Sequence, residues 1–140
     1  MRGSSNLSCG LMRNGCPYAL LVEDEALVAM FAADALREMG FEVAEAPSAS
    51  RALALAAAEI SDFEIAIVDL GLPDRDGADL VVELKQMRRD LPIIVASGQS
   101  AETAAAELAR YEKLSVLSKP YQFSTLRASL VAFGIATDGL

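Results

Sequence analysis

The sequence predicts an α/β protein in which a five-stranded parallel sheet carries helices on both faces. Short apolar runs alternate along the chain with longer segments of helical periodicity, and brief loops join them, as expected for this class. The chain has 140 residues, of which 53% are hydrophobic, so it has the length and the apolar content for one domain with its own core. We therefore expect a doubly wound (βα)5 architecture.

Five short runs are the expected strands, because they are mostly β-branched or aliphatic and too short for core helices. They span residues 18–22, 42–46, 65–68, 93–96 and 115–118.

Five longer segments have helical periodicity and are expected at residues 25–39, 49–59, 77–87, 101–111 and 124–134. In the first, apolar residues recur at three- and four-residue spacings: Leu27, Met30, Phe31, Leu36 and Met39. Gly40 is expected to end this helix, while Ser48 and Ser124 are the expected N-caps of the second and fifth. In the fourth and fifth helices we expect Leu108, Leu126 and Leu130 to belong to the core rather than to an interface.

The domain is expected to span residues 18–134, between a polar leader or tag-like extension at 1–17 and a short tail at 135–140. Both cysteines, Cys9 and Cys16, lie in the leader, where a disulfide would stabilise no core, so a reduced cytoplasmic protein is expected. No run approaches the roughly 20 apolar residues of a membrane span.

The charged residues and the histidine content limit the classes of function that we expect. Twenty acidic residues against twelve basic ones give a net charge of −8, which disfavours binding to nucleic acids and to anionic membranes. The chain contains no histidine, so it lacks the commonest general base and any phosphohistidine of its own. Its chemistry must therefore rest on carboxylates, hydroxyls and lysine.

Polar residues follow four of the five predicted strands. Glu23 and Asp24 come after the first, Asp69 after the third, Ser97 after the fourth and Lys119 after the fifth. Each alone could be a helix cap or a solvated surface charge. The carboxyl ends of parallel strands lie along one edge of the sheet, however, so together they predict one shared pocket.

An acidic pocket of this kind suits Mg²⁺. Three ionised carboxylates within a few ångströms repel one another unless a cation offsets their charge. Mg²⁺ takes one or two carboxylates together with waters and phosphate oxygens, and a lysine beside it can pair with a phosphoryl oxygen.

Residues 21–25 and 67–77, with Ser97-Gly98 and Lys119-Pro120-Tyr121, resemble the motifs of response-regulator receiver domains. The resemblance covers about residues 18–134. It implies the flavodoxin-like strand order 2-1-3-4-5, with a switch point between the first and third strands.

The resemblance also implies a role for each matching residue. Asp69 would be the phosphorylated side chain. Asp24, Asp69 and the backbone carbonyl of Gly71 would bind Mg²⁺, and Glu23 would hold metal-bound waters.

The two remaining motif residues would act on the phosphoryl group. Ser97 would contact it, and Lys119 would bridge it to Asp69. The peptide bond between Lys119 and Pro120 would be cis.

The partners follow from the same resemblance. A sensor histidine kinase or a histidine phosphotransferase would donate the phosphoryl group, and the domain would catalyse its own phosphorylation and dephosphorylation. A downstream protein would read the face made by the fourth helix, the fifth strand and the fifth helix, which could also form a homodimer. Whether the module is freestanding or part of a larger regulator or hybrid kinase is left open.

Two positions bear on the conformational change after phosphorylation and on the lifetime of the phosphoryl group. The position three before Lys119, commonly aromatic in the family, is Val116, a stiff and small residue, so a smaller or differently routed conformational change is expected. Gln99 could orient an attacking water and tune the lifetime of the phosphoryl group, whereas Gly71 cannot; both could equally be simple loop residues.

Three alternatives remain. A phosphatase of the haloacid-dehalogenase type would need a second aspartate two residues after the first, where this chain has Gly71. An interaction module that is never phosphorylated would not need the full set of acids, hydroxyl and lysine. A flavin-binding protein would need a phosphate-binding loop where residues 23–25 are acidic.

Overall fold

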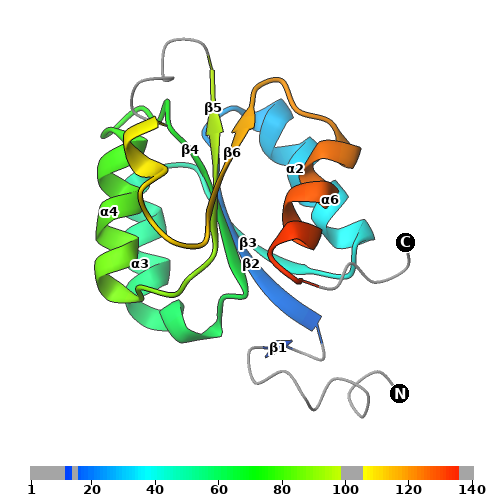
Figure 1. Ribbon diagram of the computed structural model, residues 1–140, viewed down its shortest axis with the longest axis horizontal. Coiled ribbons are helices and arrows are strands. Elements are labelled where there is room, and N and C mark those ends of the chain that lie inside the picture. Colours follow the sequence, from blue (N-terminus) through cyan, green and yellow to red (C-terminus); the bar gives the residue numbers. More distant parts are fainter. Residues whose placement is uncertain (1–11, 14–15, 99–105, 136–140) are drawn as a thin grey trace.

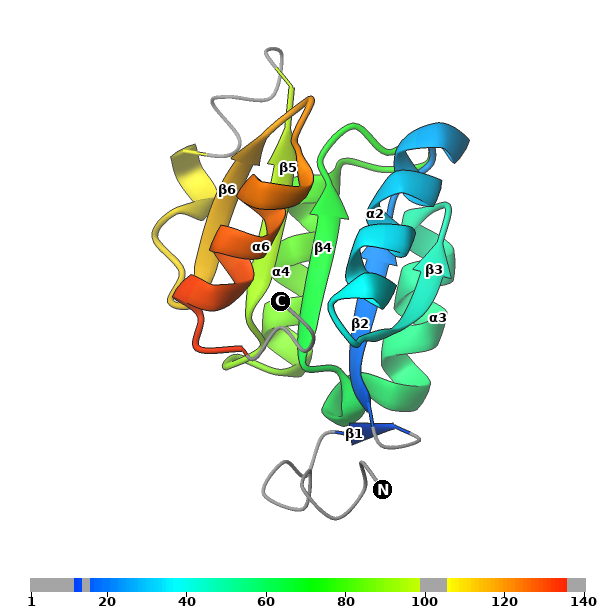
Figure 2. The same cartoon turned by 90° about the vertical axis from the view of Figure 1, so that its right-hand side faces the viewer.

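A computed structural model of the chain describes residues 12–13, 16–98 and 106–135. In this part of the chain the parallel strands are β2 (Cys16–Val22), β3 (Glu42–Ala46), β4 (Ile65–Asp69), β5 (Ile93–Ser97) and β6 (Leu114–Ser118). They pair in the order β3-β2-β4-β5-β6, which is the predicted order 2-1-3-4-5 (Figure 2). A two-residue strand, β1 (Met12–Arg13), pairs antiparallel with the start of β2.

Helices cover both faces of this sheet. They are α2 (Ala26–Glu38), α3 (Ala49–Glu59), α4 (Gly77–Met87) and α6 (Phe123–Ala132), with a 3-10 turn, η1 (Ile60–Asp62), after α3. Helices α2 and α6 lie on one face, and α3 and α4 lie on the other (Figure 1). The predicted doubly wound architecture is thus confirmed.

The alternation of side chains along β2 explains the two-layered core. Tyr18, Leu20 and Val22 pack into the cluster under α3 and α4, whereas Ala19 and Leu21 pack into the cluster under α2 and α6. A strand with apolar residues at every position is expected where both faces are covered.

Four strand boundaries extend beyond the predicted ones, among them the start of β6 at Leu114. Asp69 and Ser97 are the last residues of β4 and β5 rather than the first residues after them, because each still pairs with a residue of the next strand. Strand β2 begins at Cys16 because this residue pairs with Arg13. The two site residues are therefore held by the sheet itself.

The helix ends show which local signals were correct. Gly40 follows α2 with a φ of 97°, a conformation that favours glycine, and Ser48 caps α3 by accepting a hydrogen bond from the Arg51 N–H. Ser124 was wrong as a cap, since it lies inside α6. Gln122 is the N-cap instead, and its N–H donates to the Thr125 hydroxyl over 3.0 Å.

The predicted fourth helix is only partly described. Residues 106–108 are helical, and the turn that follows replaces the last three expected helical positions. Residues 101–105 lie outside the described part. Leu108, Leu126 and Leu130 are buried, as expected for core residues.

Helix α2 differs most from expectation. Leu27, Met30 and Phe31 are 80%, 58% and 40% exposed, although their spacing suggested a core face. The buried face of α2 consists of Leu36 and the small residues Ala32, Ala33 and Ala35. Larger apolar side chains are therefore left on the outer side of the helix, near its first half.

A buried lysine joins two loops at the amino-terminal edge of the sheet. The Lys85 ammonium group, on α4, donates to the carbonyls of Leu91 and Glu112 over 2.7 Å each. Burial lowers the pKa of Lys85. This contact could not be predicted from the sequence, because its acceptors are backbone atoms. Within the described residues, no helix combines the length and apolarity needed to cross a membrane.

The close approach of α4 to β4 yields a stability prediction. A Cβ on Gly77 would lie 2.5 Å from the Asp69 carbonyl oxygen, so Gly77→Ala is expected to lower the free energy of unfolding by about 2 kcal/mol through overpacking. Urea denaturation measures it. Gly98→Ala is the matched control, because a Cβ there meets nothing within 4 Å. Equal stability of the two variants would contradict the prediction.

Candidate functional site

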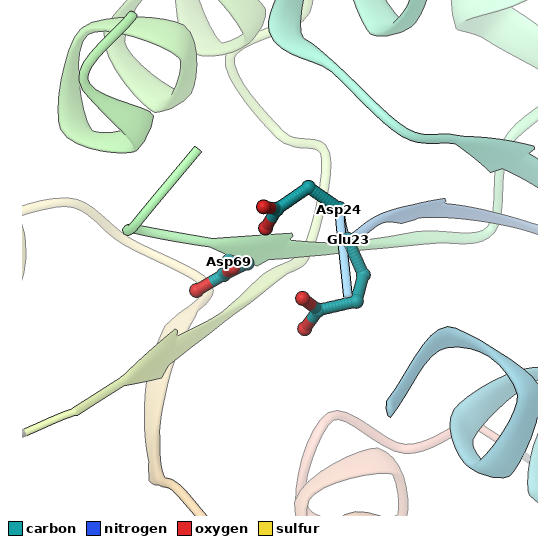
Figure 3. Close-up of side chains that lie close together, drawn as sticks. All are labelled: Glu23, Asp24 and Asp69. Carbon is teal, nitrogen blue, oxygen red and sulfur yellow. The ribbon is translucent and has the colours of Figure 1, made fainter. Parts of the chain in front are cut away.

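Three carboxyl groups converge at the carboxyl ends of two neighbouring strands. Glu23 and Asp24 follow β2, and Asp69 ends β4, so the pairing of β2 with β4 brings them together. One oxygen atom from each lies within 4.8 Å of the others (Figure 3). Glu23 and Asp69 are buried, whereas Asp24 is exposed, so the cluster opens toward solvent on the side of Asp24.

The sheet and the loop after it orient Asp69. Its Oδ1 atom accepts a hydrogen bond from the Gly71 N–H over 3.1 Å. The following residue, Leu70, donates its N–H to the Ala96 carbonyl of β5 over 3.1 Å. The Gly71 N–H thus orients the Asp69 carboxylate itself, and the Leu70 N–H fixes the backbone directly after Asp69.

Lys119 completes the cluster from the end of β6. Its Nζ atom lies 3.3 Å from Asp69 Oδ1, and 3.5 Å from both Glu23 Oε1 and Glu25 Oε1. Its backbone N–H donates to the Ser97 carbonyl over 2.9 Å, which fixes the chain next to β5. The Lys119–Pro120 peptide bond is cis, as the resemblance implied.

The charges at Lys119 favour its ammonium form. Burial by itself would lower the pKa of Lys119, but the neighbouring carboxylates of Asp69 and Glu23 outweigh burial and raise it. Lys119 is therefore a fixed positive charge at the edge of the acid cluster.

Glu23 shows how crowded the acids are. Burial, together with the charge of Asp69, raises the pKa of Glu23 to about 7, although the Glu25 N–H donates to its Oε2 atom over 3.1 Å and Lys119 lies close. One positive side chain is thus not enough to keep all the acids charged. A divalent cation would supply the missing charge.

The donor set fits such a cation. Asp24 and Asp69 offer carboxylate oxygens, and Glu23 adds a third carboxyl group beside them. Hard oxygen ligands of this kind suit Mg²⁺, which also retains water. Among the described residues, the cluster contains no nitrogen or sulfur ligand, so the soft transition metals have no preferred donor there.

The remaining predicted residues lie around this cluster. Ser97 is buried at the end of β5, and its hydroxyl donates to the Gly98 carbonyl over 3.0 Å. Val116 is 44% exposed on β6. Gln99 lies outside the described residues.

Three residues of the site region belong to the quoted motifs but had no predicted role. Glu25 contacts Lys119, and its position next to the acidic pair could have suggested this. Burial, and then the charge of Glu23, raises the pKa of Tyr121 to about 12, which keeps this phenol neutral. Asp74 contacts the start of α3, and nothing local in the sequence indicates that contact.

Comparison with known proteins gives one consistent result. Residues 19–131 match the family model described as the response regulator receiver domain. The chain is 37% identical over 111 residues to the KDP operon transcriptional regulatory protein KdpE of Escherichia coli (strain K12), covering 79% of this chain and 48% of KdpE. It is 32% identical over 117 residues to the sensor kinase CckA of Brucella abortus (strain 2308), covering 84% of this chain and 12% of CckA.

The solved structures agree on the fold. A response regulator receiver domain protein from Clostridium thermocellum superposes with a TM-score of 0.78 at 21% identity, covering 83% of this chain and 92% of that one. The chain spans about half or less of the two curated relatives, so the match concerns only part of each. Since the family model covers most of the chain, the protein belongs to the response regulator receiver domain family.

Proposed function

We propose that this chain is a phosphorylation-controlled switch of a two-component or phosphorelay system, in which Asp69 accepts a phosphoryl group from a phosphohistidine of a partner protein. The observation that carries the proposal is the position of Lys119 Nζ, 3.3 Å from Asp69 Oδ1, beside three carboxyl groups within 4.8 Å. This arrangement offers a nucleophile, a cation-binding oxygen set and a fixed positive charge in one place. The partner would be a sensor histidine kinase or a histidine phosphotransferase.

Phosphoryl transfer requires mainly that the reacting groups be held in the correct positions. An Asp69 carboxylate oxygen forms a bond to phosphorus while the bond from phosphorus to the donor imidazole nitrogen breaks, and the electron pair leaves with the histidine. In a loose transition state the charge spreads over the three equatorial oxygens. Lys119 is placed to neutralise part of it, and the Ser97 hydroxyl can turn from the Gly98 carbonyl to donate to a phosphoryl oxygen.

Mg²⁺ would be held by Asp24, Asp69 and the Gly71 carbonyl, with Glu23 orienting its waters. When bound, the ion offsets the repulsion among the acids and neutralises charge on the phosphoryl oxygens. Water later attacks the phosphorus atom of the acyl phosphate, which releases inorganic phosphate and regenerates the Asp69 carboxylate. Gln99 stays a predicted influence on that rate.

The output would be read on the face formed by the helix that ends at residue 108, by β6 and by α6. The aspartyl phosphate adds nearly two negative charges and three acceptor oxygens, which draw the Ser97 hydroxyl toward them. Val116, half-exposed on β6, is too small to exchange inward and outward positions as an aromatic ring could. The rearrangement should therefore centre on the Ser97 end of β5.

The surface beside the site favours a protein donor over a small molecule. Leu27 and Phe31, on the exposed side of α2, line a hollow of about 480 Å³ together with Lys119, Pro120 and Tyr121. Met30, next to them on α2, is also exposed. Exposed apolar side chains around the approach to a polar reaction centre are typical of surfaces that contact a protein.

The alternative is a receiver-like interaction module that is never phosphorylated. The cluster itself argues against it, because desolvating Glu23 and Asp69 next to each other is costly, as the raised pKa of Glu23 indicates. A binding surface alone would not require that cost.

Incubation with acetyl phosphate and Mg²⁺ tests the acceptor. Intact-mass spectrometry should show the added mass of one phosphoryl group on the native chain and none on Asp69→Asn, because the amide is not a nucleophile toward phosphorus. Chelation of Mg²⁺ should abolish the gain. A phosphoryl mass on Asp69→Asn equal to that on the native chain, or no gain on the native chain with any competent donor, would refute the proposal.

Amide chemical shifts test the role of Val116. Beryllofluoride with Mg²⁺ should shift amides near Asp69, Ser97 and Lys119 strongly and those of α6 weakly, because Val116 has no second rotamer that fills an aromatic-sized space. Val116→Tyr should extend the strong shifts over β6 and α6. Strong shifts across α6 in the native chain would show that the switch does not depend on this position.

Two exposed residues of α2 test the donor surface. The double variant Leu27→Ser and Met30→Ser should slow phosphotransfer from a histidine-phosphorylated partner by about tenfold, because loss of an interface anchor costs about 1 to 2 kcal/mol. Phosphorylation by acetyl phosphate should stay unchanged. Val131→Ser, on an exposed apolar residue of α6, is the control. Equal slowing with both donors would point to damage at the site instead.

A further inference from the structure

The first turn of α3 has an unusual source of hydrogen-bond acceptors. The first four N–H groups of a helix have no partner within it. In α3, the Ser48 hydroxyl accepts from the Arg51 N–H, and the Ser48 carbonyl accepts the first regular helical bond, from the Ala52 N–H. The first two, those of Ala49 and Ser50, donate to Oδ1 and Oδ2 of Asp74 over 3.0 Å each. A carboxylate 24 residues away therefore completes the cap.

Asp74 belongs to the loop that carries the metal and phosphoryl chemistry. This loop leaves β4 at Asp69, passes Gly71 and enters α4 at Gly77. The N–H of Gly77 donates back to the Leu70 carbonyl over 3.2 Å, which closes the base of the loop. The Asp74 carboxylate fixes the outer part of the loop against a neighbouring helix. Helices α3 and α4 lie side by side on one face of the sheet, which makes this contact possible (Figures 1 and 2).

The other acid-bearing loop is tied to the same connection. The N–H of Glu23 donates to the carbonyl of Ala46, at the end of β3, over 3.0 Å. Ala46 and Ser50 bracket the short turn from β3 into α3. One side of this turn therefore holds the loop of Glu23 and Asp24, and the other side holds the loop of Asp69 and Gly71 through Asp74.

We infer that Asp74 is a positioning residue for the cation site: its carboxylate, bound to the first turn of α3, sets the distance between the two loops that supply the oxygen ligands. The inference rests on the proposed function, because it concerns the same Mg²⁺ site. The hydrogen bonds from Ala49 and Ser50 lower the pKa of Asp74, so the carboxylate keeps its charge at neutral pH, where the positive end of the α3 dipole also favours it.

The test compares Mg²⁺ binding by the native chain, Asp74→Ala and Ser48→Ala. Both variants remove acceptors from the first turn of α3, and both should lower the melting temperature. Only Asp74→Ala cuts the tie to the loop, so only this variant should lose Mg²⁺ affinity, by about tenfold, the lower end of the effect seen for outer partners of metal ligands. The rate of phosphorylation by acetyl phosphate at subsaturating Mg²⁺ should fall in parallel.

Salt separates positioning from simple charge loss. Removal of any nearby negative charge weakens cation binding, but such an effect shrinks in roughly 0.5 M sodium chloride, whereas a displaced loop persists. Asp74→Asn keeps the size of the side chain but replaces one acceptor oxygen with a donor group, so it should show part of the same salt-independent loss.

Each outcome decides the inference. Mg²⁺ affinity of Asp74→Ala within twofold of that of Ser48→Ala, or a loss that vanishes at high salt, overturns it while leaving the proposed function intact. A native chain that neither binds Mg²⁺ nor becomes phosphorylated overturns both together.

Discussion

The repulsion among three carboxyl groups at one edge of the sheet is the constraint on which the site depends. Glu23 and Asp69 are buried, and Asp24 lies close to both. The raised pKa of Glu23 reflects the unfavourable free energy of ionising it there. Lys119 reduces that cost without removing it. A protein that keeps such a cluster must hold its backbone firmly, because side chains that repel one another would otherwise move apart.

The fold supplies that firmness. Asp69 and Ser97 lie inside strands rather than after them, so ladder hydrogen bonds hold both. Lys119 is fixed by its N–H bond to the Ser97 carbonyl, one strand away. The acid-bearing loops are short and tied to the turn before α3. The cluster is therefore held in a fixed arrangement, which the proposed cation binding and phosphoryl transfer would require.

Much of this could be predicted from the sequence, because the strand pattern and the polar residue at each strand end are local features. Parallel pairing then converts equivalent positions into neighbours, which is why Glu23, Asp69 and Lys119 were placed together correctly. Contacts between distant backbone and side-chain atoms could not be predicted in this way. Two examples are the carbonyl groups that accept hydrogen bonds from Lys85 and the two N–H groups that donate to Asp74. Neither contact changes the spacing of apolar residues along the sequence. The exposure of the large apolar residues on α2 was also not predicted, because a pattern of apolar residues does not distinguish an exposed Leu27 from a buried Ala33.

The exposed apolar residues of α2 lie beside the acid cluster, where Leu27 and Phe31 line a hollow together with Lys119. Because Leu36 and three alanines pack α2 against the sheet, the large apolar residues on its outer side add nothing to the core and cost solubility. Under the proposed function, their position beside Lys119 would serve a partner protein that approaches Asp69. On the same proposal, the acid cluster and the exposed apolar residues of α2 would meet one requirement, because a phosphoryl group bound to a partner's histidine must be delivered in line to a carboxylate that the sheet holds in place.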